Sequence, residues 1–196
     1  MVALWMASLD RSLHDIELRR LTDALPAWRR ERLERLKRTE WQREPLCAYW
    51  LLRRVLWECC GWLEFPDMAH TPSGKPYFPQ WPDVHFSISH TDGVVMVGLA
   101  DREIGVDVER LRPVKEQMLR RFDCDSENAF FEAWTRREAR AKRTGSPVEL
   151  GAESPLQPRE RIVYPKCFSG YTACAVWLGE EAADVRCMTM EELLRN

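Results

Sequence analysis

The stretch from residue 85 to residue 109 constrains the fold most, because three short alternating segments follow one another with tight turns between them. Side chains alternate between apolar and polar in residues 85–90, so Phe86 and Ile88 share one face of a half-buried strand. Residues 94–100 and 104–109 read as two further strands, joined by an Asp92-Gly93 turn and a turn at residues 101–103. We therefore predict an antiparallel meander of three strands.

The third of these strands carries two acids on one side. In Gly105-Val106-Asp107-Val108-Glu109 the carboxylates of Asp107 and Glu109 point the same way from positions two apart. Two anions about 7 Å apart repel by roughly 2 kcal/mol at an effective dielectric near 20. Oxygen ligands on a rigid strand suit a hard divalent cation such as Mg2+. Two solvated acids at an exposed strand end would give the same pattern, so both interpretations stay open.

A third acid lies on the apolar side of a predicted helix. Residues 130–142 follow helical spacing, and Glu138 shares a face with Phe131 and Trp134. An unpaired carboxylate is costly there, and a nearby cation would explain it. Lys142 lies four residues on, so a plain Glu-Lys helix pair is the alternative.

Other segments predict a strand at residues 2–8 and helices at 13–25, capped by Ser12, and at 46–60, ended by Gly61. Shorter helices are expected near residues 114–122 and 190–194, and short strands at 162–164, 167–168 and 171–178. The Pro-rich and Gly-rich segments 66–82 and 146–158 predict loops, the first with a turn at Ser73-Gly74-Lys75-Pro76.

A locally basic segment covers residues 28–43. Its arginines and lysines outnumber its acids, although the chain as a whole has a net charge of -2. A phosphate-binding face and a solvated helix face with i,i+4 ion pairs both fit this composition. His90, at a strand end, is a further candidate for phosphate contact, or is structural.

The bulk composition excludes several classes of protein. A chain of 196 residues is long enough for one sizeable domain, and its balanced charge does not favour nucleic acid. No apolar run is long enough to span a membrane, and residues 1–9 read as a first strand and not as a signal peptide. Seven cysteines without a CxxC or Cys/His spacing predict reduced thiols in a cytoplasmic protein.

Four stretches, in this order, resemble the 4'-phosphopantetheinyl transferases, specifically their larger single-chain (Sfp-type) class. They are Gly74-Lys75-Pro76, residues 86–90 (FSISH), residues 105–109 (GVDVE) followed by Arg112-Pro113, and residues 134–142 (WTRREARAK). Each motif alone is weak, but their order and separation together are specific. The resemblance implies an α+β fold of two similar halves with pseudo-two-fold symmetry and an active site in the cleft between them. It places these halves at residues 1–102 and 103–196, in a monomer.

The resemblance also implies an activity, of the holo-[acyl-carrier-protein] synthase type. The phosphopantetheine arm of coenzyme A, the substrate, would move to a serine of an apo acyl or peptidyl carrier protein, releasing adenosine 3',5'-bisphosphate. Asp107, Glu109 and Glu138 match the family's Mg2+ ligands, and Glu138 also matches its general base. Lys142 would steady the leaving phosphate.

Five further positions match coenzyme A contacts. Ser89 and His90 match phosphate contacts and Lys75 a contact on the adenine and ribose side, while Arg29 and Arg32 lie where the family holds the 3'-phosphate. The chain departs from the family in carrying Arg137 where a lysine is usual, and in the Arg43-Glu44-Pro45 sequence that opens the long helix. It is also short between Pro113 and Phe130, where relatives shape the carrier-protein surface.

Three other functions compete with the transferase. The short segment after Pro113 is compatible with a non-catalytic relative that binds coenzyme A or a carrier protein. The three acids could also serve a metal-dependent phosphohydrolase. A nucleic-acid-binding module would rest on residues 29–43, where acids interrupt the basic run.

Overall fold

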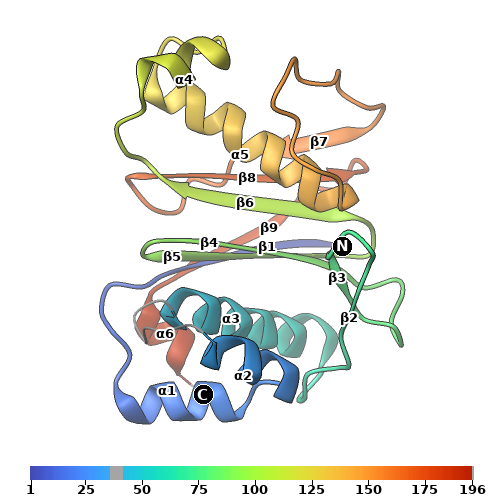
Figure 1. The fold of residues 1–196 in the computed structure, drawn as a ribbon. Helices are drawn as coiled ribbons and strands as arrows, with labels where there is room; N and C mark the ends of the chain where they lie inside the picture. Colours follow the sequence, from blue (N-terminus) through green and yellow to red (C-terminus); the bar gives the residue numbers. More distant parts are fainter. Residues whose placement is uncertain (36–41, 196) are drawn as a thin grey trace.

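Two β-sheets lie against each other in the middle of the molecule, and helices cover the outer face of each (Figure 1). The structure, a computed structural model, describes residues 1–35 and 42–195, without the side chains of Trp28, Arg32 and Glu34. The fold is mixed α+β, as the resemblance implies. Hydrophobic clusters fill the space between the two sheets and the space under the helices on either side.

The first sheet has the strand order β4-β5-β1-β9. Its strands are β1 (Val2–Ser8), β4 (His85–Thr91), β5 (Val94–Ala100) and β9 (Asp184–Met188). β1 pairs antiparallel with β5 and parallel with β9. Because both faces of this sheet are covered, alternate residues of β1 enter different hydrophobic clusters, which explains why nearly every residue of the strand is apolar.

The second sheet has the order β6-β8-β7. Its strands are β6 (Ile104–Arg110), β7 (Glu160–Val163) and β8 (Tyr171–Leu178). The predicted three-stranded meander is therefore wrong at its third strand. β5 has β4 on one edge and β1 on the other, so β6 finds no free edge there and pairs with β8 instead. A separate two-stranded ribbon, β2 (Ala69–His70) with β3 (Pro76–Tyr77), closes around the predicted Gly74 turn.

Six helices are described, and N-terminal capping hydrogen bonds mark the start of some of them. They are α1 (Asp15–Asp23), α2 (Ala27–Glu34), α3 (Arg43–Cys60), α4 (Glu116–Arg121), α5 (Glu127–Thr144) and α6 (Met190–Leu194). α5 begins three residues before its predicted start, because the Ser126 hydroxyl accepts the Ala129 N–H at 3.3 Å. The predicted Ser12 cap is wrong, since α1 is capped at His14, whose N–H donates to Glu17 at 2.8 Å.

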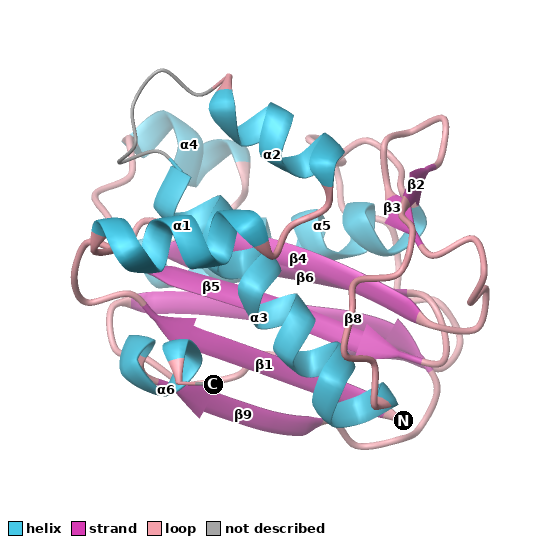
Figure 2. Cartoon of the chain, turned by 90° about the horizontal axis from the view of Figure 1, so that it is seen from below, coloured by secondary structure: helices cyan, strands magenta, loops and turns pink. Residues whose placement is uncertain are grey.

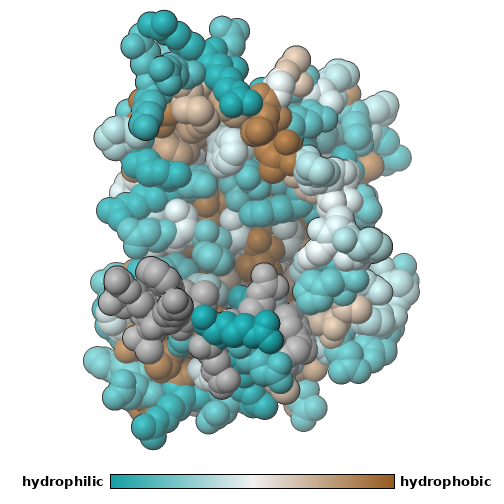
Figure 3. All heavy atoms as spheres, in the orientation of Figure 1, coloured by the Kyte–Doolittle hydropathy of each residue, from teal (hydrophilic) through white to brown (hydrophobic). Residues whose placement is uncertain are grey.

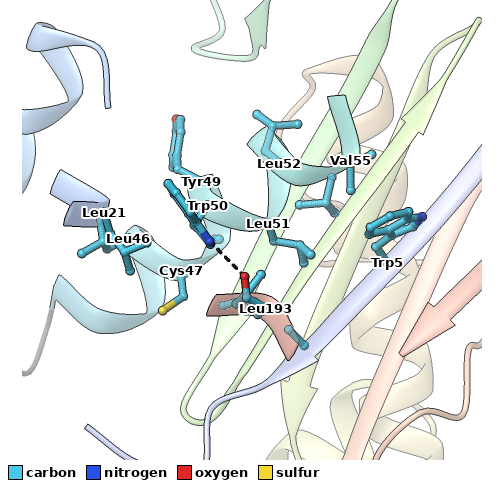
Figure 4. Packing of buried hydrophobic residues seen from close by; sticks show 14 of the residues in the cluster. Trp5, Leu21, Leu46, Cys47, Tyr49, Trp50, Leu51, Leu52, Val55 and Leu193 are labelled. Carbon is cyan, nitrogen blue, oxygen red and sulfur yellow. Dashed lines mark hydrogen bonds between the residues drawn. The ribbon is translucent and has the colours of Figure 1, made fainter. Parts of the chain in front are cut away.

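The long helix α3 crosses the outer face of the first sheet, with α1 and α6 beside it (Figure 2). Its inner residues Leu51, Leu52 and Val55 are completely buried. Trp50 packs in the same cluster and donates its indole N–H to the Leu193 carbonyl of α6 at 3.0 Å (Figure 4). Gly61 ends the helix in the left-handed conformation, with φ 73°, as the sequence predicts.

The other long helix, α5, lies unusually close to β6. A Cβ atom built on Gly105 would lie 1.9 Å from the Ala139 carbonyl oxygen and 2.4 Å from the Arg143 nitrogen. Only glycine permits this approach of strand to helix. Asp107 and Glu109 follow Gly105 on the same face of the strand, so the approach brings their side chains toward α5.

The C-terminal segment differs from the sequence prediction in three respects. Residues 184–188, expected in a polar tail, form β9, whereas residues 167–168 lie outside the strands. Cys167 and Cys187 form a disulfide, so the expectation that all the thiols are reduced is wrong for this pair. The predicted helix at residues 190–194 is confirmed as α6.

The chain passes from the first sheet to the second in the turn at residues 101–103, and returns to the first with β9. The division into two similar halves at residue 102 stays a prediction. Of the helices in the described ranges, none combines the length and apolar character needed to cross a membrane. The face shown in Figure 3 is mostly hydrophilic, with hydrophobic residues in small groups.

The Gly105 contact predicts the effect of a single methyl group. We expect Gly105→Ala to destabilise the protein by about 2–3 kcal/mol, because the helix backbone cannot move away as a flexible side chain could. Gly151→Ala is the matched control, since its Cβ would meet nothing within 4 Å. Urea unfolding curves measure both, and equal stabilities of the two variants would contradict the described packing.

The disulfide predicts a thiol count. Unfolded without reductant, the protein should expose five reactive thiols, and all seven after reduction. Cys167→Ser should lower the free energy of unfolding by about 3 kcal/mol, the chain-entropy value for a loop of this length. A thiol-reactive dye counts the groups, and seven reactive thiols in the unreduced protein would rule the bond out.

Candidate functional site

A pocket of about 490 Å3 collects five of the side chains that the sequence identifies as site residues. Its walls come from α2, α3, the turn before β3, β4 and α5. The predicted residues that line it are Arg29, Lys75, His90, Glu138 and Lys142. They lie up to 113 positions apart in the sequence, so the fold brings together side chains that no local motif connects.

Lys142, on the pocket wall, connects the pocket to the acidic strand. Its ammonium group lies 2.7 Å from Asp107 Oδ1 and 3.0 Å from Ser89 Oγ. The Ser89 hydroxyl also donates to Asp107 Oδ1 at 2.8 Å. The ion pair of Lys142 is therefore made across to β6, and the simple Glu138-Lys142 helix pair considered from the sequence is not the arrangement that forms.

Asp107 is nearly buried and its two carboxylate oxygens differ. The residue is 5% exposed, and Oδ1 accepts hydrogen bonds from both Lys142 and Ser89. Oδ2 is buried and has no hydrogen-bond partner in the described structure. A buried carboxylate oxygen without a partner is costly, so Oδ2 is a site where a cation or a donor would be stabilising.

Glu138 lies half-buried on the pocket wall, four residues before Lys142. Burial raises the pKa of this carboxyl group above its ordinary value, and the negative charges of Asp107 and Glu109 raise it further, against the opposing effect of Lys142. The three predicted acids are thus close enough to interact. Glu109 itself is paired with Arg112 at 2.7 Å, near the end of β6.

The chemistry of these groups fits a hard divalent cation, because all three are carboxylates and one oxygen has no partner. Within residues 1–35 and 42–195, however, no three His, Cys, Asp or Glu side chains are already arranged as a metal-binding group. Binding an ion with all three acids would require at least one carboxylate to turn. The three-acid metal site therefore stays a proposal, with Asp107, Glu109 and Glu138 as its ligands.

The remaining predicted residues supply the basic part of the pocket. The Lys75 ammonium donates to the Arg143 carbonyl at the end of α5, and burial lowers the pKa of Lys75. The Arg29 guanidinium lies 4.1 Å from the centre of the Tyr49 ring. Burial by the surrounding protein lowers the pKa of His90, although the residue as a whole is exposed. The Arg32 side chain lies outside the described part of the chain.

The structure adds pocket residues that the sequence did not identify. Ser87 and residues 146–148 line the pocket, and Tyr49 both lines it and supports Arg29. Residues 146–148 belong to a loop held by the buried Arg137, which donates to the carbonyls of Glu149 at 2.9 Å and Gly151 at 2.7 Å. An arginine at a buried helix position is the one sequence signal that could have pointed to this loop.

No family model matches the chain. Its sequence is similar to several curated proteins, each named a 4'-phosphopantetheinyl transferase. A 4'-phosphopantetheinyl transferase of Bacillus subtilis is 26% identical over 163 residues, covering 74% of this chain and 71% of the relative. The transferase psf-1 of Bacillus pumilus is 32% identical over 95 residues, which cover 42% of this chain and 41% of the relative.

Another relative has the same name. The 4'-phosphopantetheinyl transferase AcpT of Salmonella typhi is 29% identical over 114 residues, covering 50% of this chain and 59% of the relative. The aligned portion of the Bacillus subtilis proteins, one of them named Sfp, extends over about three quarters of the chain. The resemblance inferred from four motifs is therefore confirmed, since the chain is similar over about three quarters of its length to the Sfp-type 4'-phosphopantetheinyl transferases.

Proposed function

We propose that this protein transfers the phosphopantetheine arm of coenzyme A to a serine hydroxyl of an apo carrier protein, in a Mg2+-dependent reaction that releases adenosine 3',5'-bisphosphate. The observation that carries the proposal is one pocket lined by the predicted base, Glu138, and by four side chains predicted to contact coenzyme A. The transfer activity is the one named for its relatives.

The reaction needs a nucleophile, an in-line leaving group and charge neutralisation. The serine oxygen of the carrier would form the new bond to the phosphorus that bears pantetheine, as the bond to the adenosine bisphosphate breaks. Glu138 would accept the serine proton, directly or through a water, and its raised pKa makes it a stronger base than an exposed glutamate. Lys142 would neutralise charge on the leaving phosphate.

Mg2+, when bound, would polarise the pyrophosphate and neutralise charge as the bond breaks. Its ligands would be Asp107, Glu109 and Glu138. Asp107 Oδ2 supports this assignment, because it is a buried anionic oxygen that accepts no hydrogen bond in the described structure. Ser89 and Lys142 both donate hydrogen bonds to Oδ1, so they fix the carboxylate in place and leave Oδ2 available to a cation.

We further propose that the pocket is the cleft between two similar halves, residues 1–102 and 103–196. Its walls support this, since Arg29, Lys75 and His90 precede the division and Glu138 and Lys142 follow it. A monomer would then contain a complete site. The apo acyl or peptidyl carrier protein would approach the open side of the pocket.

The transfer itself predicts a mass change. Incubation with coenzyme A, Mg2+ and an apo acyl carrier protein should give a carrier heavier by one phosphopantetheine, and a chelator should stop the reaction. An unchanged carrier mass across several apo carriers would contradict the proposal. Tight coenzyme A binding without any transfer would instead favour a non-catalytic relative, an alternative that the short segment around α4 keeps open.

Asp107→Asn should lower kcat at least about 100-fold, equivalent to about 2.7 kcal/mol of activation free energy. Asparagine keeps an acceptor for Ser89 and Lys142, so the variant removes the charge without leaving these donors unpaired. Glu132→Gln is the matched control, because this acid is exposed on α5 and does not line the pocket. Mass spectrometry of the carrier measures the rates, and similar losses in both variants would count against a specific role for Asp107.

His90 predicts a pH dependence of coenzyme A binding. Burial lowers the pKa of His90 below its ordinary 6.5 in the free protein, so the ring is neutral at pH 7. A bound phosphate favours the imidazolium and raises the pKa of His90, so binding takes up a proton. Affinity should therefore rise severalfold from pH 8 to pH 6.5.

Calorimetry in buffers of different ionisation enthalpy measures this proton uptake. His90→Gln should remove most of it and leave only the titration of the ligand's own phosphate, whose second pKa lies near 6. Identical pH profiles for the wild type and the variant would show that His90 does not contact a phosphate.

A further inference from the structure

Three hydroxyl groups on β4 hold β6 in place. Ser87 Oγ accepts the Val106 N–H at 3.0 Å, and Ser89 Oγ accepts the Val108 N–H at 3.2 Å. Thr91 Oγ1 accepts the Arg110 N–H at 3.3 Å. The two strands belong to different sheets, so side-chain oxygens replace the backbone carbonyls of an ordinary ladder. All three residues thus share one structural role, and any further role must come from their other contacts.

The Ser89 hydroxyl has no hydrogen-bonding capacity left. A serine hydroxyl donates one hydrogen bond and accepts two. Ser89 donates to Asp107 Oδ1 and accepts from the Val108 N–H and the Lys142 ammonium. A phosphate oxygen could only accept the serine proton, and that proton is already held by a carboxylate. Ser89 is 5% exposed and, among the described residues, it is not part of the pocket lining.

Ser87 is 6% exposed, so it is nearly as buried as Ser89, but it differs from Ser89 in its contact with the pocket and in its hydrogen bonds. It lines the pocket, on the same strand as His90. Its oxygen accepts the Val106 N–H, but no acceptor for its own proton is described in residues 1–35 and 42–195. Ser87 therefore has a hydroxyl proton that a ligand oxygen in the pocket could accept.

We infer that Ser87, and not Ser89, donates a hydrogen bond to the phosphate or ribose oxygens of the bound nucleotide. Ser89 is a positioning residue, which holds Asp107 and Lys142 and leaves Asp107 Oδ2 for the cation. The inference rests on the proposed function, and it reverses the assignment that the family resemblance implies for Ser89.

Three variants separate these roles. Each removes one of the hydroxyl groups that accept a hydrogen bond from a backbone N–H of β6. Ser87→Ala should raise the Kd for coenzyme A, measured by calorimetry without divalent ions, about tenfold, with kcat within about threefold of the wild type. Ser89→Ala should keep that Kd within about twofold and lower kcat at least about tenfold, the usual effect of removing a residue that orients a metal ligand. Thr91→Val should change neither the Kd for coenzyme A nor kcat by more than about threefold.

Two results would overturn the inference. One is a raised Kd with unchanged kcat in Ser89→Ala, which would make Ser89 a ligand contact. The other is an equal loss of kcat in all three variants, which would leave only the shared structural role. Amide hydrogen exchange shows that each variant is folded, because only its own partner among Val106, Val108 and Arg110 should exchange faster. Ser89→Cys, with a weak donor of similar size, replaces the alanine variant if that variant does not fold.

An inactive wild-type protein would defeat the proposed function but not this test. The roles are then judged on binding alone. Ser89→Ala should weaken Mg2+ binding about tenfold and leave coenzyme A binding unchanged, whereas Ser87→Ala should do the reverse. Equal effects of the two variants on both ligands would overturn the assignment.

Discussion

The close approach of β6 to α5 at Gly105 is the constraint on which the candidate site depends. With no side chain at this position, the strand lies against the helix backbone near Ala139 and Arg143. Asp107 is the next residue on that face of the strand, and Lys142 lies beside Arg143 on the helix. The 2.7 Å ion pair between them follows from that geometry. A strand held further away would separate the acids from their cation and expose them to water.

The charges at the site are balanced against one another and are sensitive to any added ion. Lys142 compensates Asp107 directly, whereas burial, and then the negative charges of Asp107 and Glu109, raise the pKa of the Glu138 carboxyl group. Glu109 relies on Arg112 at the end of the strand. Three carboxylates against one lysine and one arginine leave the site short of positive charge. A divalent cation would correct this deficit, and in the proposed reaction it would arrive with the phosphates of coenzyme A.

The sequence predicts the parts of this site better than their assembly. Alternation in residues 105–109 identifies a strand with two acids on one face, as the structure has it. Helical spacing predicts that Glu138 lies among apolar residues, whereas the structure places it half-buried on the pocket wall with Lys142. The meander prediction failed because alternation gives the face of a strand but not its neighbour. Nothing local to β6 indicates that β1, about 100 residues earlier, already occupies the edge of β5. Likewise, β9 forms only because β1 offers it a partner.

Arg137 shows how one departure from the family pattern can be explained by its contacts. The family usually has a lysine here, and this chain has an arginine that is 8% exposed. One of its terminal nitrogens donates to two carbonyls of the loop after α5, those of Glu149 and Gly151. A guanidinium has five donors in a fixed plane and is more weakly hydrated than an ammonium, so it can be buried against a loop at lower cost. That loop carries residues 146–148 into the pocket wall, so the substitution contributes to the shape of the site without entering it.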